Sequence, residues 1–154
     1  MSQLPILTMT NSVAALIIDE DGRYLLQLRD DVPDIWFPDH WGLFGGAIDG
    51  DEGLEEALAR EMEEELGFVP DAATYFTRFD YDASFFGRPG AVLTRHYYVV
   101  SVSAEAEKDF QLGEGQRFRF FEPQAILDGL RIAPYDSFIL WLYLSHDRIN
   151  FYSP

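Results

Sequence analysis

The sequence predicts an α/β domain in which strands pack with helices in layers. Its 154 residues, 47% of them hydrophobic, are enough for one sizeable core and too few for two. Short runs rich in β-branched and aromatic residues occur on both sides of one long helical segment, and an apolar helical segment follows near the C-terminus. Residues 1–154 are therefore expected to form a single domain.

The first part of the chain is predicted to begin with a β-hairpin. Residues 12–18 and 24–28 are rich in aliphatic side chains, and residues 19–22 supply turn residues between them. Residues 30–40 contain two prolines and several acids, which indicates a loop. A short strand over residues 41–44 should follow this loop.

A long helix is predicted between Glu52 and Gly67. Asp51 and Glu52 are acidic residues suited to a helix N-terminus, and Gly67 is a natural C-terminal stop. Strong helix formers fill the interval without interruption.

Four elements are predicted after this helix. Strands over residues 74–81 and 92–103 should form a prominent hairpin around the turn-forming sequence FFGRPG. Residues 116–121 are typical of another short strand. Pro123 opens a short helix through Leu127, closed by Gly129, and a last helix spans residues 135–145 with apolar side chains suited to packing on a sheet.

Three glutamates of the long helix occupy unusual positions. At about 100° per residue, one side of the helix is an apolar stripe, and its members are Leu54, Ala57 and Leu58. Glu61 and Glu65 fall in line with this stripe, and Glu64 lies at its edge. An ordinary amphipathic helix would continue the stripe with Leu or Ile.

Two interpretations of these acids are open. A run of charges is usually a solvated face, and Glu56 with Arg60 has the spacing of an ordinary surface pair. The helical phase favours the second interpretation, in which the acids lie in a wet cleft or bind a cation. Clustered oxygen ligands without Cys or His favour Mg²⁺ or Mn²⁺, and such an ion usually acts on phosphates.

The segment from Gly46 to Phe68 resembles the Nudix box, the signature of the Nudix hydrolases. The matching residues are Gly46, Glu52, Arg60, Glu61, Met62, Glu64, Glu65, Gly67 and Phe68. The resemblance implies the Nudix α/β/α sandwich with a central mixed sheet. It also implies a Mg²⁺-dependent hydrolase in which Mn²⁺ can substitute.

The resemblance assigns metal ligands to this segment. Glu64 and Glu65 match the principal ligands of the family, and Glu61 matches a position that binds metal or acts on the water. The carbonyl matching Gly45 is often a further ligand. From the residues alone, Gly45 and Gly46 either let the backbone approach a ligand or only serve a tight turn.

Other residues are expected to support or extend the site. Gly46, Glu52 and Arg60 match positions that hold the loop and helix of the box together. Glu114 lies in a glycine-flanked loop similar to the EGQ loop of the bacterial mutator-type Nudix hydrolase, where the equivalent acid contributes to the metal and water site. As an isolated loop residue it would instead be ordinary surface.

Candidate substrate-binding residues lie outside the box. Trp36 has a ring suited to stacking on a base, and Arg29 and Arg88 have charges suited to phosphate. Arg95 is a further candidate for phosphate. The alternatives are a core position for the aromatic residue and ordinary surface pairing for the arginines.

Composition excludes several classes of protein. A net charge of −16 argues against extended contact with nucleic acid, and no apolar run approaches the roughly 20 residues of a membrane span. A secretory signal and cysteines are both missing, so a cytoplasmic location is expected. Phe85 and Phe86, at an expected hairpin tip, suggest a homodimer contact.

The expected reaction is hydrolysis of a diphosphate bond by a metal-activated water. The expected substrate is a nucleoside diphosphate linked to another moiety, either a nucleoside triphosphate or a nucleotide sugar. Two alternatives are a nucleotide-sugar hydrolase that cleaves at the sugar carbon and a non-enzymatic Nudix-fold nucleotide sensor. The sequence leaves open the base or sugar, the bond cleaved and the identity of the general base.

Overall fold

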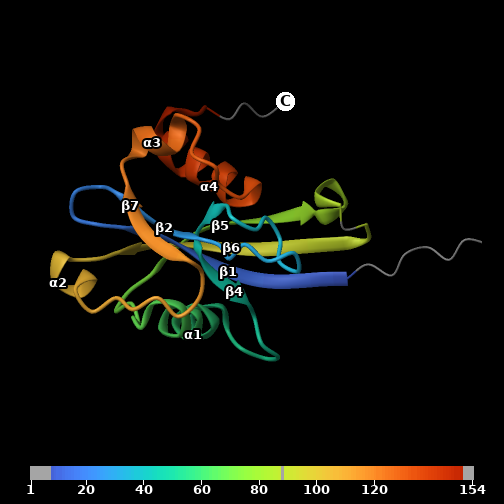
Figure 1. Ribbon diagram of the computed structural model, residues 1–154, viewed down its shortest axis with the longest axis horizontal. Coiled ribbons are helices and arrows are strands. Elements are labelled where there is room, and N and C mark those ends of the chain that lie inside the picture. Colours follow the sequence, from blue (N-terminus) through green and yellow to red (C-terminus); the bar gives the residue numbers. More distant parts are fainter. Residues whose placement is uncertain (1–7, 88, 151–154) are drawn as a thin grey trace, which may run out of the picture.

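A seven-stranded mixed sheet forms the centre of the computed structural model, which describes residues 8–87 and 89–150 (Figure 1). The strands are β1 (Thr8–Ile18), β2 (Tyr24–Leu28), β3 (Trp41–Gly42), β4 (Phe44–Ala47), β5 (Thr74–Asp82), β6 (Ala91–Ser101) and β7 (Arg117–Phe121). Their order is β3-β2-β1-β6-β5, and β4 also pairs with β1 and β7 with β2. The pairing of β1 with β6 is parallel and the other pairings are antiparallel, which confirms the predicted mixed sheet.

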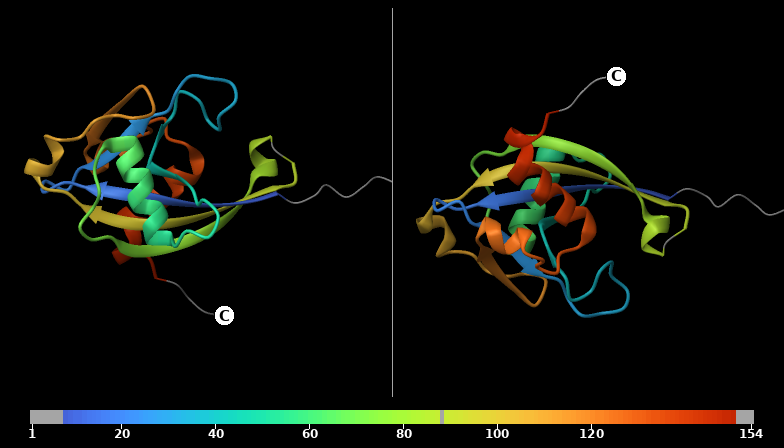
Figure 2. Two further views of the ribbon diagram at one scale, coloured as in Figure 1. Left: turned by 90° about the horizontal axis from the view of Figure 1, so that it is seen from below. Right: turned by 90° about the horizontal axis from the view of Figure 1, so that it is seen from above.

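Helices cover both faces of this sheet, as Figures 1 and 2 show. Helix α1 (Leu54–Leu66) lies on one face, and α3 (Pro123–Leu127) and α4 (Pro134–Ser145) lie on the other. The remaining helices are short: α2 (Ala104–Glu107) and the 3₁₀ helices η1 (Ala83–Phe86) and η2 (His146–Arg148). The predicted α/β/α sandwich is confirmed. No helix in the described ranges has the length and apolar character that crossing a membrane requires.

Strand β1 supplies side chains to two separate cores. Val13, Ala15 and Ile17 belong to the cluster beneath α1, whereas Ala14 and Leu16 belong to the cluster beneath α4. Successive side chains of a strand point to opposite faces, so a strand segment between two helical layers can be apolar at successive positions, as Val13 to Ile17 are. This pattern explains the continuous aliphatic run that predicted the first strand.

The predicted strand over residues 41–44 is wrong in one respect, because it is two strands separated by Leu43. Strands β1 and β2 pair only near the turn that joins them, at Ile17 with Leu25 and Ile18 with Tyr24. Beyond that point they diverge. The short strand β3 therefore pairs with β2, and the next short strand, β4, pairs with β1. The sheet splits between β3 and β4, at Leu43.

Most other predicted elements are confirmed, with shifts at their ends. β1 starts four residues before the predicted Ser12 because its parallel pairing with β6 begins at Thr8 and Ala91. β6 stops at Ser101 because Ser103 caps α2, its hydroxyl accepting a hydrogen bond from the Ala106 N–H. The FFGRPG turn is partly the 3₁₀ helix η1. Arg88 and the side chains of Phe85 and Phe86 lie outside the described residues.

Candidate active site

Glu61 and Glu65 are buried on the face of α1 that packs against the sheet. Their exposed fractions are only 9% and 4%. The phase of the helix is fixed by apolar neighbours, since Ala57, Leu58 and Met62 are fully buried on the same side. The predicted inward placement of these two glutamates is therefore confirmed. Glu64 lies at the edge of this face, with 56% of its side chain exposed.

The glycine pair of β4 lets the backbone approach these acids closely. The Gly45 N–H donates a hydrogen bond of 2.8 Å to Glu65 Oε2. A Cβ on Gly46 would lie 2.5 Å from the carboxylate of Glu61, and one on Gly45, whose φ is +149°, would lie 2.0 Å from the Val13 carbonyl oxygen. Close packing thus requires glycine at both positions, and at Gly45 the backbone conformation requires it as well.

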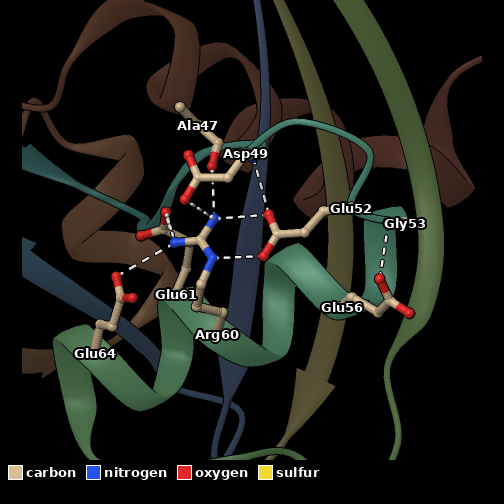
Figure 3. A network of polar contacts seen from close by, with 8 residues as sticks. All are labelled: Ala47, Asp49, Glu52, Gly53, Glu56, Arg60, Glu61 and Glu64. Carbon is tan, nitrogen blue, oxygen red and sulfur yellow. Dashed lines mark hydrogen bonds and ion pairs between the residues drawn. The ribbon is translucent and has the colours of Figure 1, made fainter.

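Arg60 connects the loop before α1 to the acidic face of the helix (Figure 3). Its Nε and Nη2 donate to the two oxygens of Glu52 at 2.6 and 2.9 Å, and Nη2 also donates to the Ala47 carbonyl at 2.9 Å. Its Nη1 donates to Glu61 Oε1 at 2.8 Å and to Glu64 Oε2 at 3.3 Å. The guanidinium thus bridges the carboxylates of the loop and the helix.

This arrangement corrects one prediction and supports another. Glu56 and Arg60 form no surface pair, because Glu56 instead accepts a hydrogen bond of 3.1 Å from Gly53, the residue that caps α1. The expected holding function of Glu52 and Arg60 agrees with the geometry, since Glu52 also accepts from the Asp49 N–H at 2.9 Å. Hydrogen bonds from Arg60 and Asp49 lower the pKa of Glu52 to about 2.

Glu114 reaches the same site from a loop that packs on the end of α1. The Gln111 N–H donates to the Leu66 carbonyl at 2.9 Å, and the Gly113 N–H donates to the Glu65 carbonyl at 2.8 Å. A Cβ on Gly113 would lie 2.0 Å from the Glu64 carbonyl oxygen, so only glycine fits there. These contacts place Glu114 beside Glu65 at one cavity.

The cavity has a volume of about 100 Å³ and a largely polar lining that includes Gln27, Arg29, Asp30, Glu65 and Glu114. Arg29, predicted to contact phosphate, is thus the one cationic side chain that lines it among the described residues. Its Nε donates to the Trp36 carbonyl at 2.9 Å.

Two other substrate candidates, Trp36 and Arg95, are not among the described residues that line this cavity. The side chain of Trp36 is partly buried against a cluster made of Leu93, Ala133 and Tyr135. Arg95 is 7% exposed and pairs with Asp136, so the alternative of ordinary surface pairing is wrong for it, and its contact with phosphate stays a prediction. Arg88 lies outside the described residues.

Burial destabilises the charged forms of Glu61 and Glu65 relative to their protonated forms. Burial raises the pKa of Glu65 to about 8, the charges of Glu61 and Glu114 add to this rise, and the Gly45 N–H and Arg95 oppose it. The pKa of Glu61 is also raised by burial, against the opposing effect of Arg60. Carboxylates in such a position are stabilised by a proton or by a cation.

The donor set fits a hard divalent cation in its chemistry. It contains the oxygens of Glu61, Glu64 and Glu65 and the backbone of Gly45, with no sulfur or imidazole. Within the described residues no three acidic or imidazole side chains already converge in metal-binding geometry. The Arg60 guanidinium is the cation that contacts Glu61 and Glu64 here.

Sequence reasoning missed a fully buried acid in the second helical layer. Asp136 is fully buried near the start of α4, where its Oδ2 accepts a hydrogen bond of 2.9 Å from the Leu43 N–H. Its Oδ1 lies 3.3 Å from Arg95 Nε. In the sequence, Asp136 follows Pro134 as an ordinary acid of a first helical turn, so no signal distinguished it.

The mixed sheet between helices, with a glycine pair held against glutamates of the central helix, defines a Nudix-type domain. Comparison with known families agrees. The NUDIX domain family matches residues 8–142, and the chain belongs to this family.

Similarity to individual proteins is local in sequence and extensive in structure. Nucleoside triphosphatase NudI of Escherichia coli O139:H28 is 43% identical over 56 residues, which are 36% of this chain and only 39% of that protein. The MutT protein of Methanosarcina mazei Go1 superposes with a TM-score of 0.77 at 22% identity, covering 93% of this chain and 98% of that one. The E. coli ORF135 protein gives 0.72 at 27% identity, with 92% and 93% covered.

Proposed function

We propose that this protein hydrolyses a diphosphate bond in a nucleoside diphosphate linked to another moiety, in a reaction that depends on Mg²⁺. The observation that carries the proposal is the pair of buried carboxylates, Glu61 and Glu65, packed against the Gly45–Gly46 backbone beside Glu114. The name of the partly similar NudI, a nucleoside triphosphatase, favours nucleoside triphosphates as the first substrates to test.

The chain offers ligands for Mg²⁺, or Mn²⁺ in its place, in Glu61, Glu64, Glu65 and the Gly45 carbonyl. When bound, the ion would neutralise the diphosphate oxygens and lower the pKa of water at the site. Arg60 holds Glu61 and Glu64, and the Gly45 N–H orients Glu65. These contacts limit the rotamers of the carboxylates before any substrate arrives.

Side chains that line the cavity are assigned the transfer of the proton from water and the binding of the substrate phosphate. The water oxygen forms a bond to phosphorus while the bridging phosphorus–oxygen bond breaks, and the proton of the water passes to a carboxylate. Glu65 and Glu114 line the cavity, so we assign the proton acceptor to this pair. Arg29, on the same lining, offers charge to a phosphate of the substrate.

The alternatives predict different products. Cleavage at the sugar carbon of a nucleotide sugar would release a free sugar and an intact nucleoside diphosphate. A sensor would bind a nucleotide without turnover. The full set of box acids favours hydrolysis over a sensor, because a sensor has no need of buried, mutually repelling carboxylates.

The test is turnover of a panel of nucleoside triphosphates and nucleotide sugars with and without Mg²⁺, with all products identified. We expect Glu64→Gln and Glu65→Gln to lose about 100-fold or more in turnover. Glu63→Gln, an exposed neighbour on the same helix, is the matched control and should retain it. Tight binding of one nucleotide without turnover of any would replace the hydrolase with the sensor.

A further inference from the structure

Leu43 occupies the point where the sheet splits. It is the single residue between β3 and β4, so the chain pairs with β2 just before it and with β1 just after it. Leu43 is also almost completely buried. A buried N–H without an acceptor costs on the order of 1–3 kcal/mol, so the Leu43 amide needs a partner.

The segment before α4 begins a parallel ladder with this part of the chain but does not complete it. The Trp41 N–H donates to the Arg131 carbonyl at 2.9 Å, and the Ala133 N–H donates to the Trp41 carbonyl at 2.8 Å. The next step of a parallel ladder would take the Leu43 N–H to the Ala133 carbonyl. That carbonyl already accepts the first bonds of α4, from the N–H groups of Asp136 and Ser137.

The side chain of Asp136 takes the place of the missing backbone acceptor. Its Oδ2 accepts from the Leu43 N–H at 2.9 Å. Gly42 makes room for this approach, since a Cβ there would lie 3.1 Å from the same oxygen. The Asp136 carboxylate therefore accepts the hydrogen bond of the Leu43 N–H that the Ala133 carbonyl would accept in a continued parallel ladder.

Arg95 forms an ion pair with the other oxygen of this carboxylate, without a hydrogen bond between Arg95 Nε and Asp136 Oδ1. Its Nε lies 3.3 Å from Asp136 Oδ1, and its guanidinium lies over the rings of Tyr97 and Tyr135, with centroids at 5.8 and 5.4 Å. Arg95 belongs to β6, next to β1 in the sheet. The pair thus links α4 and β6 to the split between β3 and β4.

We propose that Asp136 is a positioning residue of the active site, which fixes Leu43 at the split in the sheet and thereby sets Gly45 against Glu65. Gly45 is only two residues beyond Leu43, and its N–H makes the 2.8 Å bond to Glu65. A shift of Leu43 is therefore transmitted through Phe44 to the Gly45 N–H and so to the carboxylate. The catalytic consequence rests on the proposed hydrolase function, but the structural link does not.

Two double variants separate this function from simple ion pairing. Removing one charge alone would leave the other buried and unpaired, which is strongly destabilising. Arg95→Met/Asp136→Asn and Arg95→Met/Asp136→Leu both remove the two charges. Asn and Leu have the same branched shape, but only Asn can accept the Leu43 N–H bond.

We expect the Leu double variant to show faster hydrogen exchange at the Leu43 and Gly45 amides than the Asn double variant. We also expect weaker Mg²⁺ binding by calorimetry and a kcat lower by about 10- to 100-fold, with KM changed much less. Equal exchange, Mg²⁺ affinity and kcat in the two variants would overturn the proposal.

Gly42→Ala provides a second test if the Leu double variant does not fold. The added methyl group would press on Asp136 Oδ2 without removing any charge, so exchange at Leu43 and Gly45 should again accelerate. Unchanged exchange in this variant would also overturn the proposal. If the native protein turns over no nucleotide, the hydrolase function fails, whereas the exchange comparison still decides the positioning.

Discussion

Glu65 carries a carboxylate that the fold keeps almost out of water. It receives one backbone hydrogen bond, from Gly45, and faces two other acids, Glu61 and Glu114. Such a group is stable in the folded protein only when it is protonated or close to a cation. The charge state of this one residue therefore links stability, pH and metal binding.

We expect the free energy of unfolding of the metal-free protein to fall as pH rises from about 4.5 to about 8. The pKa of Glu65 is raised from 4.5 to about 8 in the folded state, so in this window the folded state binds more protons than the unfolded state. The slope from one such group is at most about 1.4 kcal/mol per pH unit. Urea titrations at several pH values measure it.

Glu65→Gln should flatten this pH dependence because it removes the titrating group. Glu63→Gln, on the exposed side of α1, should keep it. A native slope that persists unchanged in Glu65→Gln would show that other groups produce it.

Gly46→Ala should reduce turnover by at least about 10-fold, because the new methyl group would lie 2.5 Å from the Glu61 carboxylate and would displace it. Gly53→Ala is the control, since its added methyl group would meet nothing closer than 3.9 Å and its φ is −70°. Steady-state kinetics of both variants check this. Full activity of Gly46→Ala would mean that Glu61 need not hold this position.

Single residues differed in how far they were predictable. Helical periodicity correctly placed Glu61 and Glu65, because their phase follows from the apolar residues around them. It wrongly paired Glu56 with Arg60, because Arg60 bonds to the preceding loop and to Glu61 and Glu64 of its own helix instead. Asp136 was unpredictable, since its importance arises from a backbone amide 93 positions earlier in the chain.

At the scale of elements, the site depends on how α1, β4 and the loop around Glu114 meet. The loop is attached to the last turn of α1 by backbone hydrogen bonds from Gln111 and Gly113. It is attached to the end of β2 by Gln116, whose N–H donates to the Leu28 carbonyl at 2.8 Å. Glu114 lies between these two attachments.

Gly113→Ala should detach this loop from α1, because its Cβ would lie 2.0 Å from the Glu64 carbonyl oxygen. We expect turnover to approach that of Glu114→Gln, together with a lower melting temperature. Kinetics and thermal unfolding of both variants measure these effects, with Gly53→Ala again as the control. Normal activity in Gly113→Ala alongside an inactive Glu114→Gln would argue that Glu114 does not need this attachment.

Elements with a strong local signal were predicted well, and those set by their neighbours were not. Helix α3 has the predicted bounds because Pro123 opens it, and α1 ends at Gly67 in a left-handed conformation, as expected. The break at Leu43 was missed because residues 41–44 look like one strand. Which neighbour a short strand chooses depends on the divergence of β1 and β2, a tertiary property.

At the scale of the whole molecule, a net charge of −16 opposes the compact state. The inward carboxylates of α1, Glu61 and Glu65, contribute to this negative charge. Their burial makes the charged form of each less favourable than it would be at the surface. A divalent cation at this place would relieve both local and overall repulsion. Specific and nonspecific effects of salt therefore have to be separated.

Millimolar Mg²⁺ should raise the melting temperature by more than NaCl of the same ionic strength, because binding to the folded state alone adds stability. A Glu61→Gln/Glu65→Gln double variant should lose this additional shift, and Glu63→Gln should keep it. Differential scanning calorimetry measures all three proteins. An equal shift in the double variant would indicate screening of surface charge instead of a metal site.

The layered architecture was predictable from the sequence, but the order of strands was not. Composition and periodicity predict strands and helices in layers, and the Nudix resemblance implies the sandwich. Neither indicates that β1 lies between β2 and β6, because pairing partners are selected by long-range packing. The family resemblance supplied the sandwich arrangement, which periodicity alone did not.

The parallel pairing of β1 with β6 also has a consequence for how the protein folds. The bond from the Ser12 hydroxyl to the Thr94 carbonyl joins residues 82 positions apart, and the two strands pair over the full length of β1. On the ribosome, the central strand would emerge long before its parallel partner is synthesised. Its aliphatic side chains, buried on both faces in the finished fold, would then be covered by β2, β4 and α1 but not by β6 until that strand is synthesised.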